Sequence, residues 1–407
     1  MRQTLLIVGG GIETVPGIRL AKEMGCFVIV SDIKAQAPGM AIADAAIIAS
    51  TYDAEATVHA ARKCHHSVRR IDGVMCLASD IPLTVAAVAE DLGLAGIPVQ
   101  TAQLAMDKLA MKRKFTCDGV PVPWFGPLES AAHLQHVVAE TGYPLVLKPV
   151  DSRGARGVIR LTPEIDLKWA YEASHRYSPT GRVMVERFLS GPQVSTESIV
   201  LEGKAYTVGF SDRNYEFLDR FAPHIIENGG DLPSHLAPDV QQAVKELVQK
   251  AALSLGVRQG TVKGDIVIHE NQPFVIELAA RLSGGYFCTH EIPLNTGVEF
   301  VRCAIKMALG ERVDPEDVRP RFQRPVCQRY LFPKPGRVAR ISGVDSVARR
   351  AEIAFCQITV SENAIVGPID NHPARAGVVI ATGNTRQAAR KAAEAAITDI
   401  HIETDPL

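Results

Sequence analysis

The sequence lacks any long hydrophobic run. None of its apolar segments approaches the roughly 18–20 residues that a membrane-spanning helix needs. The first apolar run, Leu5–Val8, is too short for the core of a secretory signal peptide and leads directly into glycines. These absences predict a protein with no membrane segment and no cleaved leader.

The sequence also lacks an excess of either charge and lacks paired cysteines. Lys and Arg number 44 and Asp and Glu 45, which leaves a net charge of −1. Binding to nucleic acid needs a basic excess that displaces counterions from phosphates, so we expect no nucleic-acid partner. The eight cysteines are scattered, with no C-x-x-C pair and no His at zinc spacing. They are therefore expected to be reduced thiols of a cytoplasmic protein.

The length and the first hundred residues predict several domains of α/β type. At about 100–200 residues per domain, the chain has room for about two to four. The apolar run Leu5–Val8, the glycines 9–11, a helical pattern over 15–24 and a second apolar run over 26–30 form a β-α-β unit. The same alternation continues to about residue 101. We expect a doubly wound parallel sheet in residues 1–105.

The glycine loop of this unit has two interpretations. Gly9 and Gly11 match the first two glycines of a dinucleotide-binding fingerprint, and Asp32 lies where a ribose-binding acid would sit. The third position is Thr14 rather than Gly or Ala. One interpretation is an NAD-dependent oxidoreductase. The other, which we favour, is a tight strand-to-helix turn without a nucleotide, because the rest of the chain offers a better nucleotide site.

The middle of the chain carries candidate phosphate-binding groups. Lys108 opens a helix, and Lys148 ends the apolar strand over 143–149. A buried ammonium group is costly unless an anion meets it. The glycine-rich loop over 151–157 follows, with Arg153 and Arg156. Glycines let backbone N–H groups approach phosphate oxygens, and arginines add charge-assisted bonds. By itself, this hairpin tip could also be an ordinary exposed turn.

A second hairpin is the most informative segment. The strands over 262–269 and 274–279 are joined by a turn over 270–273, and folding about Asn271 places Asp265 opposite Glu277. Facing carboxylates repel, unless a divalent cation such as Mg²⁺ lies between them. The alternative is a solvated polar face with the register one residue off. Arg281 lies on the same face as Lys263 and Ala279 and precedes a glycine turn, a suitable place for a developing oxyanion or a carboxylate.

Together these segments resemble the ATP-grasp superfamily, in particular its carboxylate–amine ligases. The resemblance covers about residues 1–310 and rests on five motifs in order: Asp107-Lys108, "YPLVLKP", "DSRGARG", "VMVERFLSGP" and "GDIVIHENQPFVIELAARLSGG". It implies a Rossmann-like domain over 1–105, a two-lobed core with lobes 106–187 and 188–312, and a small C-terminal α+β domain over 313–407. The tail "RAGVVIATGNTRQAARKAAEAA" is similar to the last domain of purine-biosynthetic and amino-acid-ligase members.

The resemblance also implies a reaction and the residues that perform it. ATP would phosphorylate a carboxylate, and an amine would displace the phosphate. Lys108 and Lys148 would hold the ATP phosphates. The remaining implied nucleotide contacts are Ser152, Arg153, Gly154 and Gly157 over the phosphates, Glu186, Arg187, Phe188 and Leu189 at the adenine, and Glu197 at the ribose. Asp265 and Glu277 would bind Mg²⁺ or Mn²⁺. Arg281, Ser283 and Gly284 would stabilise the acyl phosphate.

Other features are less specific. Many family members carry Asn where this chain has Ala279, which leaves open whether one or two metal ions bind and whether the chain is a regulatory module without turnover. Glu227, His290 and Arg329 are candidate substrate residues, although a structural role is an equal alternative for Glu227 and the favoured one for His290 and Arg329. The helix over 385–400 is expected to pack on its own small sheet. A biotin carboxylase is disfavoured, since no Met-Lys-Met carrier site is present.

The expected substrates are a small-molecule carboxylate and an amine, including amino acids. A purine-type ligase that uses a phosphorylated ribosyl amine is the alternative within the same superfamily. The oxidoreductase that uses the glycine loop is the alternative from another class. We also expect a homodimer.

Overall fold

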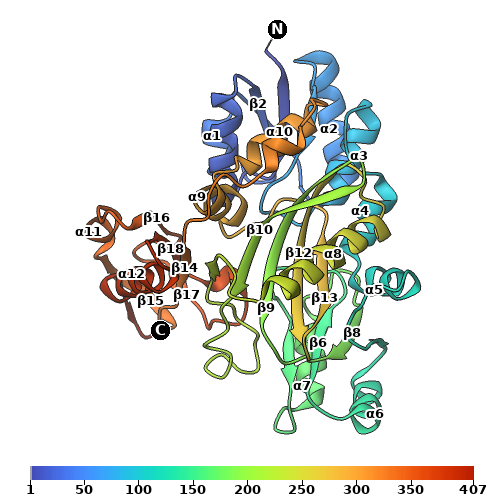
Figure 1. Ribbon diagram of the computed structural model, residues 1–407, viewed down its shortest axis with the longest axis vertical. Coiled ribbons are helices and arrows are strands. Elements are labelled where there is room, and N and C mark those ends of the chain that lie inside the picture. Colours follow the sequence, from blue (N-terminus) through green and yellow to red (C-terminus); the bar gives the residue numbers. More distant parts are fainter. Residues whose placement is uncertain (1) are drawn as a thin grey trace.

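The computed structural model describes residues 2–407, and its N-terminal part is a parallel α/β domain (Figure 1). Four strands follow the order β3-β2-β1-β4. Their bounds are β1 (Thr4–Val8), β2 (Phe27–Asp32), β3 (Ala45–Ile48) and β4 (Gly73–Met75). The central strand is apolar on both faces because helices cover both. The predicted doubly wound sheet is confirmed.

The helices on the two faces of this sheet come from different parts of the chain. The helices α2 (Ala54–Ser67) and α3 (Pro82–Leu92) cover one face, where they pack on Leu6 and Val8. The other face carries α1 (Val15–Glu23) and, from far along the sequence, α10 (Phe300–Ala308). Figure 1 shows α10 lying across the N-terminal domain. The segment that leads into α10, which includes the buried Val298, therefore packs against the N-terminal domain.

The next part is a smaller antiparallel lobe, which lies at the bottom of Figure 1. The helices α4 (Val99–Met106) and α5 (Lys108–Cys117) lead into it. Its sheet has the order β5-β8-β6-β7, and α6 (Ala131–Thr141) and α7 (Leu167–His175) pack against it through Leu134 and Ala170. The strand bounds are β5 (Phe125–Leu128), β6 (Leu145–Pro149), β7 (Ile159–Leu161) and β8 (Val183–Arg187).

The largest sheet has eight antiparallel strands in the order β13-β12-β9-β10-β11-β14-β18-β16. The helix α8 (Pro238–Ser254) covers its first half. The strands are β9 (Gln193–Leu201), β10 (Lys204–Arg213), β11 (Gly230–Leu232), β12 (Gly260–His269), β13 (Gln272–Ala279), β14 (Val326–Leu331), β16 (Ile353–Ile358) and β18 (Gly377–Thr382). The boundary predicted at 312–313 thus falls between strands of one continuous sheet.

The C-terminal helix departs from the expectation of a separate small sheet. Residues Ala389, Ala393 and Ala396 of α12 (Arg386–Asp399) are fully buried against Cys327 and Val379 of the eight-stranded sheet. Small alanines at this spacing allow the helix to pack closely on β14 and β18. A three-stranded sheet of β17 (Ile365–Val366), β15 (Gly336–Ser342) and β19 (His401–Asp405) forms separately. The short helices α9 (Ile292–Thr296) and α11 (Val344–Ala348) complete the chain.

The β12–β13 hairpin pairs Asp265 with Glu277 as predicted, but its turn is shorter than expected and its register shifts within the hairpin. The turn contains only Glu270 and Asn271, both with positive φ, as a two-residue hairpin turn requires. An extra residue, Ile276, then bulges from β13 and shifts the register by one. Asp265 consequently pairs with Glu277. Within residues 2–407 no helix is both long enough and apolar enough to cross a membrane.

Candidate active site

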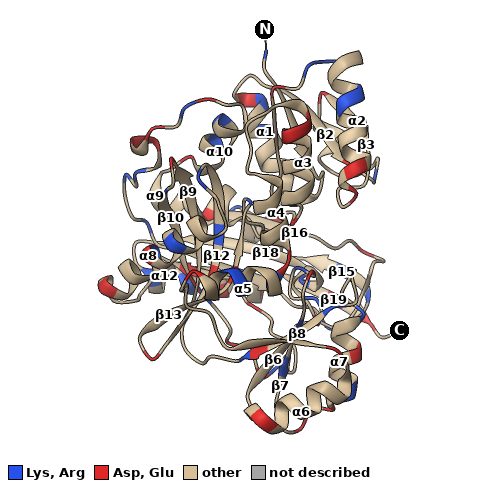
Figure 2. Ribbon diagram, turned by 90° about the vertical axis from the view of Figure 1, so that its right-hand side faces the viewer, with Lys and Arg blue, Asp and Glu red and all other residues tan. Residues whose placement is uncertain are grey.

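One cavity of about 640 Å³ lies where the N-terminal domain, both lobes and the C-terminal strands meet. Figure 2 shows α5, whose Lys and Arg residues are blue, in the middle of the molecule between the N-terminal domain and the lobe that carries α6 and α7. Most sequence-predicted site residues line this cavity: Lys108, Lys148, Ser152, Arg153, Gly154, Glu186, Arg187, Phe188, Leu189, Glu227, Asp265, Glu277, Arg281, Ser283 and Gly284. Gly157, Glu197, His290 and Arg329 do not.

The first lysine is held where the small lobe meets β13. Asp107 caps the start of α5 by accepting a hydrogen bond from the N–H of Ala110, which fixes the helix end that carries Lys108. The Lys108 ammonium donates to the Ser152 carbonyl at 2.6 Å and lies 3.3 Å from a Glu277 carboxylate oxygen. It therefore connects the glycine-rich loop with one of the two facing carboxylates.

The second lysine belongs to a buried ionic triad. Lys148 pairs with Glu186, and Lys112 lies 2.9 Å from the other oxygen of the same carboxylate. Burial alone would raise the pKa of Glu186, but the two ammonium groups hold it below its usual value. Burial lowers the pKa of Lys112 to about 8.

This triad changes the interpretation of two predicted residues. The Glu186 carboxylate faces lysines and is not free to bind an adenine amine, although the residue still borders the cavity. Lys148 has a protein anion as its partner, so a phosphate contact for it stays a prediction. Sequence reasoning missed Lys112, whose signal was its position one helical turn after Lys108.

The glycine-rich loop touches three parts of the chain. Gly154 and Ala155 have positive φ, and the Gly154 carbonyl accepts a hydrogen bond from the N–H of His372 at 3.0 Å. The Arg153 guanidinium stacks on Tyr52 of the N-terminal domain, 4.1 Å from the ring centroid. Gly157 does not line the cavity, and a Cβ at its position would meet Pro149 and Ser174.

The metal candidates Asp265 and Glu277 are flanked by cations. Asp265 accepts from Arg213 at 2.6 Å and also pairs with Lys263. Burial alone would raise the pKa of Asp265, but these cations hold it well below its usual range. No cluster of three His, Cys, Asp or Glu side chains suited to a metal occurs within residues 2–407. Mg²⁺ commonly takes one or two carboxylates together with waters and phosphate oxygens, so this pair fits it without a third protein ligand.

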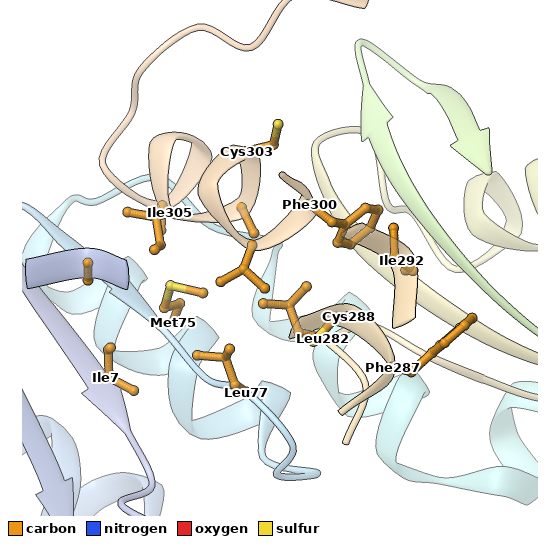
Figure 3. Packing of buried hydrophobic residues seen from close by; sticks show 14 of the residues in the cluster. Ile7, Met75, Leu77, Leu282, Phe287, Cys288, Ile292, Phe300, Cys303 and Ile305 are labelled. Atoms are coloured by element: carbon orange, nitrogen blue, oxygen red, sulfur yellow. The ribbon is translucent and has the colours of Figure 1, made fainter. Parts of the chain in front are cut away.

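Arg281 is held by a contact that the sequence did not reveal. Leu282 forms an isolated parallel bridge with Leu77 at the end of the N-terminal sheet (Figure 3). This places the Arg281 Nε–H 2.5 Å from Asp80, the residue three positions after Leu77. Asp80 keeps the pKa of Arg281 above its ordinary value despite burial, which acts to lower it. The available signal was that Asp80 follows a parallel strand, where ligand sites concentrate.

Glu197 has a different position from the predicted ribose contact. It is fully buried, and its carboxylate accepts the backbone N–H of Ser283 at 2.8 Å and the Ser283 hydroxyl. Burial raises the pKa of Glu197 to about 7. Glu197 therefore fixes the turn after Arg281 and does not face the cavity. The ribose prediction is wrong because β9 directs this side chain to the Ser283 turn.

Two of the three substrate candidates lie outside the cavity. Glu227 lines it and pairs with Arg213 at 2.5 Å. The His290 ring packs on Tyr286 and Phe355, and burial lowers its pKa to about 4. Arg329 is buried on the other side of β14, 3.4 Å from Asp231, because successive strand residues point to opposite faces. The neighbours Glu291, Gln328 and Tyr330 line the cavity instead.

In the N-terminal glycine loop, the side chain of Asp32 binds the backbone of the loop itself. The two Asp32 carboxylate oxygens accept the backbone N–H groups of Gly10 at 2.8 Å and Lys34 at 2.9 Å. Asp32 therefore closes the turn, which contradicts its assignment as a ribose-binding acid for NAD. Gly11, the last glycine of the loop, and the residues that follow it up to Thr14 border the central cavity.

Comparisons with known proteins agree with this architecture. Residues 105–285 match the family described as ATP-grasp domain, and residues 329–405 match L-amino acid ligase C-terminal domain 2. The D-alanine–D-alanine ligase of Ralstonia pickettii is 30% identical over 205 residues, which are 48% of this chain and 60% of that protein. The chain thus matches somewhat less than two thirds of that ligase's length.

Two solved structures share the fold over nearly the whole chain. The L-amino acid ligase from Bacillus licheniformis superposes with a TM-score of 0.82 at 21% identity, covering 99% of both chains. Phosphoribosylglycinamide synthetase from Anaerococcus prevotii superposes with a TM-score of 0.77 at 18% identity, covering 100% of both. The chain therefore contains an ATP-grasp domain over residues 105–285 and an L-amino acid ligase C-terminal domain 2 over residues 329–405, and it shares its fold with these two structures.

Proposed function

We propose that the protein activates a small carboxylic acid with ATP and joins it to an amine, releasing ADP and phosphate. The observation that carries this proposal is the single cavity that gathers Lys108, the glycine-rich loop, the Asp265–Glu277 pair and Arg281. Phosphoryl transfer needs cations and backbone donors that position phosphates, and acyl transfer needs a fixed donor for a developing oxyanion. One cavity supplies both.

The first step forms the acyl phosphate. A carboxylate oxygen of the acid attacks the terminal phosphorus of ATP, and the bond to the bridging oxygen breaks as ADP leaves. Lys108 and the loop around Gly154 would position the phosphates, because both border the cavity and contact each other through Ser152. Asp265 and Glu277 would hold Mg²⁺, or Mn²⁺ in its place, which supplies charge neutralisation at the phosphates.

The second step joins the amine. The amine nitrogen attacks the acyl carbon and loses a proton, and inorganic phosphate leaves with its electron pair. Negative charge builds on the carbonyl oxygen in the tetrahedral intermediate. Arg281 is preorganised for this charge, since Asp80 holds Nε and the Leu282 carbonyl accepts from Nη1 at 3.1 Å. Glu197 fixes the adjoining Ser283 turn.

A phosphate-release screen tests the proposal. Purified protein with ATP and Mg²⁺ is offered acids and amines singly and in pairs, including amino acids and a phosphorylated ribosyl amine with glycine. We expect release that requires both partners and that is lost in Arg281→Ala. Release that depends only on the ribosyl amine would favour the purine-type alternative. A pyridine-nucleotide absorbance change without ATP use would overturn the ligase assignment. The homodimer stays a prediction, which light scattering can check.

A further inference from the structure

An arginine of the glycine-rich loop has two partners in the N-terminal domain. The Arg153 guanidinium lies over the Tyr52 ring, 4.1 Å from its centroid. Its Nη1 also donates to the backbone carbonyl of Asp80 at 3.3 Å. Tyr52 lies between β3 and α2, Asp80 follows β4, and all three residues line the central cavity. The loop belongs to the small lobe and is therefore attached to the N-terminal domain through this side chain.

Tyr52 is held in place by the turn that carries it. The Thr51 carbonyl accepts a hydrogen bond from the Thr84 hydroxyl of α3 at 2.7 Å. The Asp53 carboxylate caps α2 by accepting a backbone N–H at 2.9 Å. The ring is 62% exposed, so it contributes little to the hydrophobic core. Because the face of an aromatic ring attracts a cation, the ring is a fixed support for Arg153.

The charge of Arg153 stays available for a ligand. Its partners are a neutral carbonyl and a neutral ring, and it forms no ion pair within residues 2–407. The Asp80 carboxylate beside it is paired with Arg281. Lys108, close by, is paired with Glu277. Burial alone would raise the pKa of Asp80, but the neighbouring cations, Arg153 among them, hold it below its usual value. Three cations thus face two carboxylates, and the surplus charge suits an anion.

The shared contact with Asp80 locates Arg153 along the cavity. Asp80 binds Arg281 through its carboxylate and Arg153 through its backbone carbonyl. In the proposed reaction, Arg281 lies at the carboxylate that is activated, and this carboxylate must meet the terminal phosphorus of ATP. A guanidinium attached to the same residue therefore lies nearer to the terminal phosphate than to the ribose or the adenine.

We propose that Tyr52 is a positioning residue that holds Arg153 at the terminal phosphate of ATP. This inference rests on the proposed ligase function and extends its phosphate site to the N-terminal domain. The ring fixes a side chain with many rotamers before ATP arrives, so less conformational entropy is lost on binding. The guanidinium then donates charge-assisted hydrogen bonds to the phosphate oxygens. ADP lacks the terminal phosphate and gains nothing from Tyr52.

Two nucleotides that differ by the terminal phosphate test the proposal without turnover. The wild type and its variants are titrated calorimetrically with AMP-PNP, a non-hydrolysable ATP analogue, and with ADP, each in saturating Mg²⁺. An exposed cation–π contact corresponds to a factor of about two to five in affinity. We expect Tyr52→Leu to bind AMP-PNP about two- to fivefold more weakly, with ADP affinity unchanged. Tyr52→Phe keeps the ring and should restore the affinity for AMP-PNP. Arg153→Met should lose about tenfold or more, again for AMP-PNP alone.

Two controls separate positioning from general effects. Tyr177→Leu removes another partly exposed tyrosine, which does not line the cavity, and should bind both nucleotides as the wild type does. In the Arg153→Met background, Tyr52→Leu should have no further effect on AMP-PNP affinity, because the ring acts through the guanidinium. Since Tyr52 is mostly exposed, its variants should keep the wild-type melting temperature.

The results that overturn the assignment are distinct from failure of the ligase proposal. The assignment is wrong if Tyr52→Leu binds AMP-PNP as tightly as the wild type, if it weakens AMP-PNP and ADP equally, or if Tyr52→Phe loses as much affinity as Tyr52→Leu. A further loss in the Arg153→Met background would also overturn it. Absence of phosphate release with every acid and amine would overturn the ligase proposal instead, while the titrations still decide the role of Tyr52. A wild type that binds neither nucleotide would overturn both.

Discussion

The contact between Asp80 and Arg281 provides the sharpest test of how the site is assembled. The two residues come from different domains and lie 201 positions apart, and their Oδ1 and Nε atoms are 2.5 Å apart. Asp80→Asn keeps the shape and one acceptor oxygen but removes the charge. If Asp80 acts by positioning the guanidinium, the substitution should lower catalysis and leave ATP affinity nearly unchanged.

The expected magnitude follows from the burial of the pair. The side chains of Arg281 and Asp80 are 14% and 29% exposed, so solvent screens their interaction only partly. A hydrogen bond to a charged group contributes about 1.5–3 kcal/mol, and about 1.36 kcal/mol in a barrier is tenfold in rate. Asp80→Asn should therefore lower kcat by about 10- to 100-fold. Arg281→Ala should lower it by about 10²–10³, the usual loss for one oxyanion donor.

A double-mutant cycle separates positioning from direct contact. Phosphate release measures kcat, and titration of AMP-PNP measures nucleotide affinity for both single variants and for the double variant. Because Asp80 acts through Arg281, the double variant should be no slower than Arg281→Ala, to within about threefold. Losses that multiply would refute the reasoning and place Asp80 in contact with substrate. Equal losses of AMP-PNP affinity and kcat in Arg281→Ala would place that residue in the nucleotide site.

Four further predictions address the remaining parts of the molecule. Glu277→Gln should lower Mg²⁺-dependent turnover by about 10² or more with an unchanged melting temperature, and normal turnover would exclude it as a metal ligand. Lys148→Met should raise the KM for ATP about tenfold or more; unfolding with unchanged ATP affinity would make it purely structural. Burial raises the pKa of Glu197 to about 7, so its contribution to stability is full below about pH 4.5 and is lost as pH rises through 7. Between about pH 4.5 and a pH above 7, the free energy of unfolding of the wild type, measured by urea titration, should fall by roughly 3 kcal/mol relative to that of Glu197→Gln. The same pH dependence in the two proteins would contradict this. Asp231→Asn removes the carboxylate partner of the buried Arg329 and should lower the free energy of unfolding by about 3–5 kcal/mol. Asp399→Asn removes its half-exposed ion pair with Arg350 and should lower the same quantity by under about 1 kcal/mol. Similar losses in the two variants would refute the contrast.

Local rules explain what the sequence predicted well. The period-2 pattern and the short turn of one hairpin were enough to place Asp265 opposite Glu277. The hairpin was expected to fold about Asn271, whereas the observed turn is centred between Glu270 and Asn271, and the one-residue bulge at Ile276 restores the predicted pairing. The β-α-β order predicted the parallel N-terminal sheet, because crossover connections leave few alternatives. These features depend on residues close together in the chain.

The partners of buried charges were decided by the tertiary structure. The sequence identified Lys148, Glu186 and Arg281 as important, but it could not show which ions would neutralise them. Glu197 was assigned to a ribose, although it bonds Ser283, 86 residues away. Charge and hydrogen-bonding capacity are properties of a residue type, and a single sequence therefore reveals them. The group that satisfies them depends on which distant segments pack together, which only the folded chain determines.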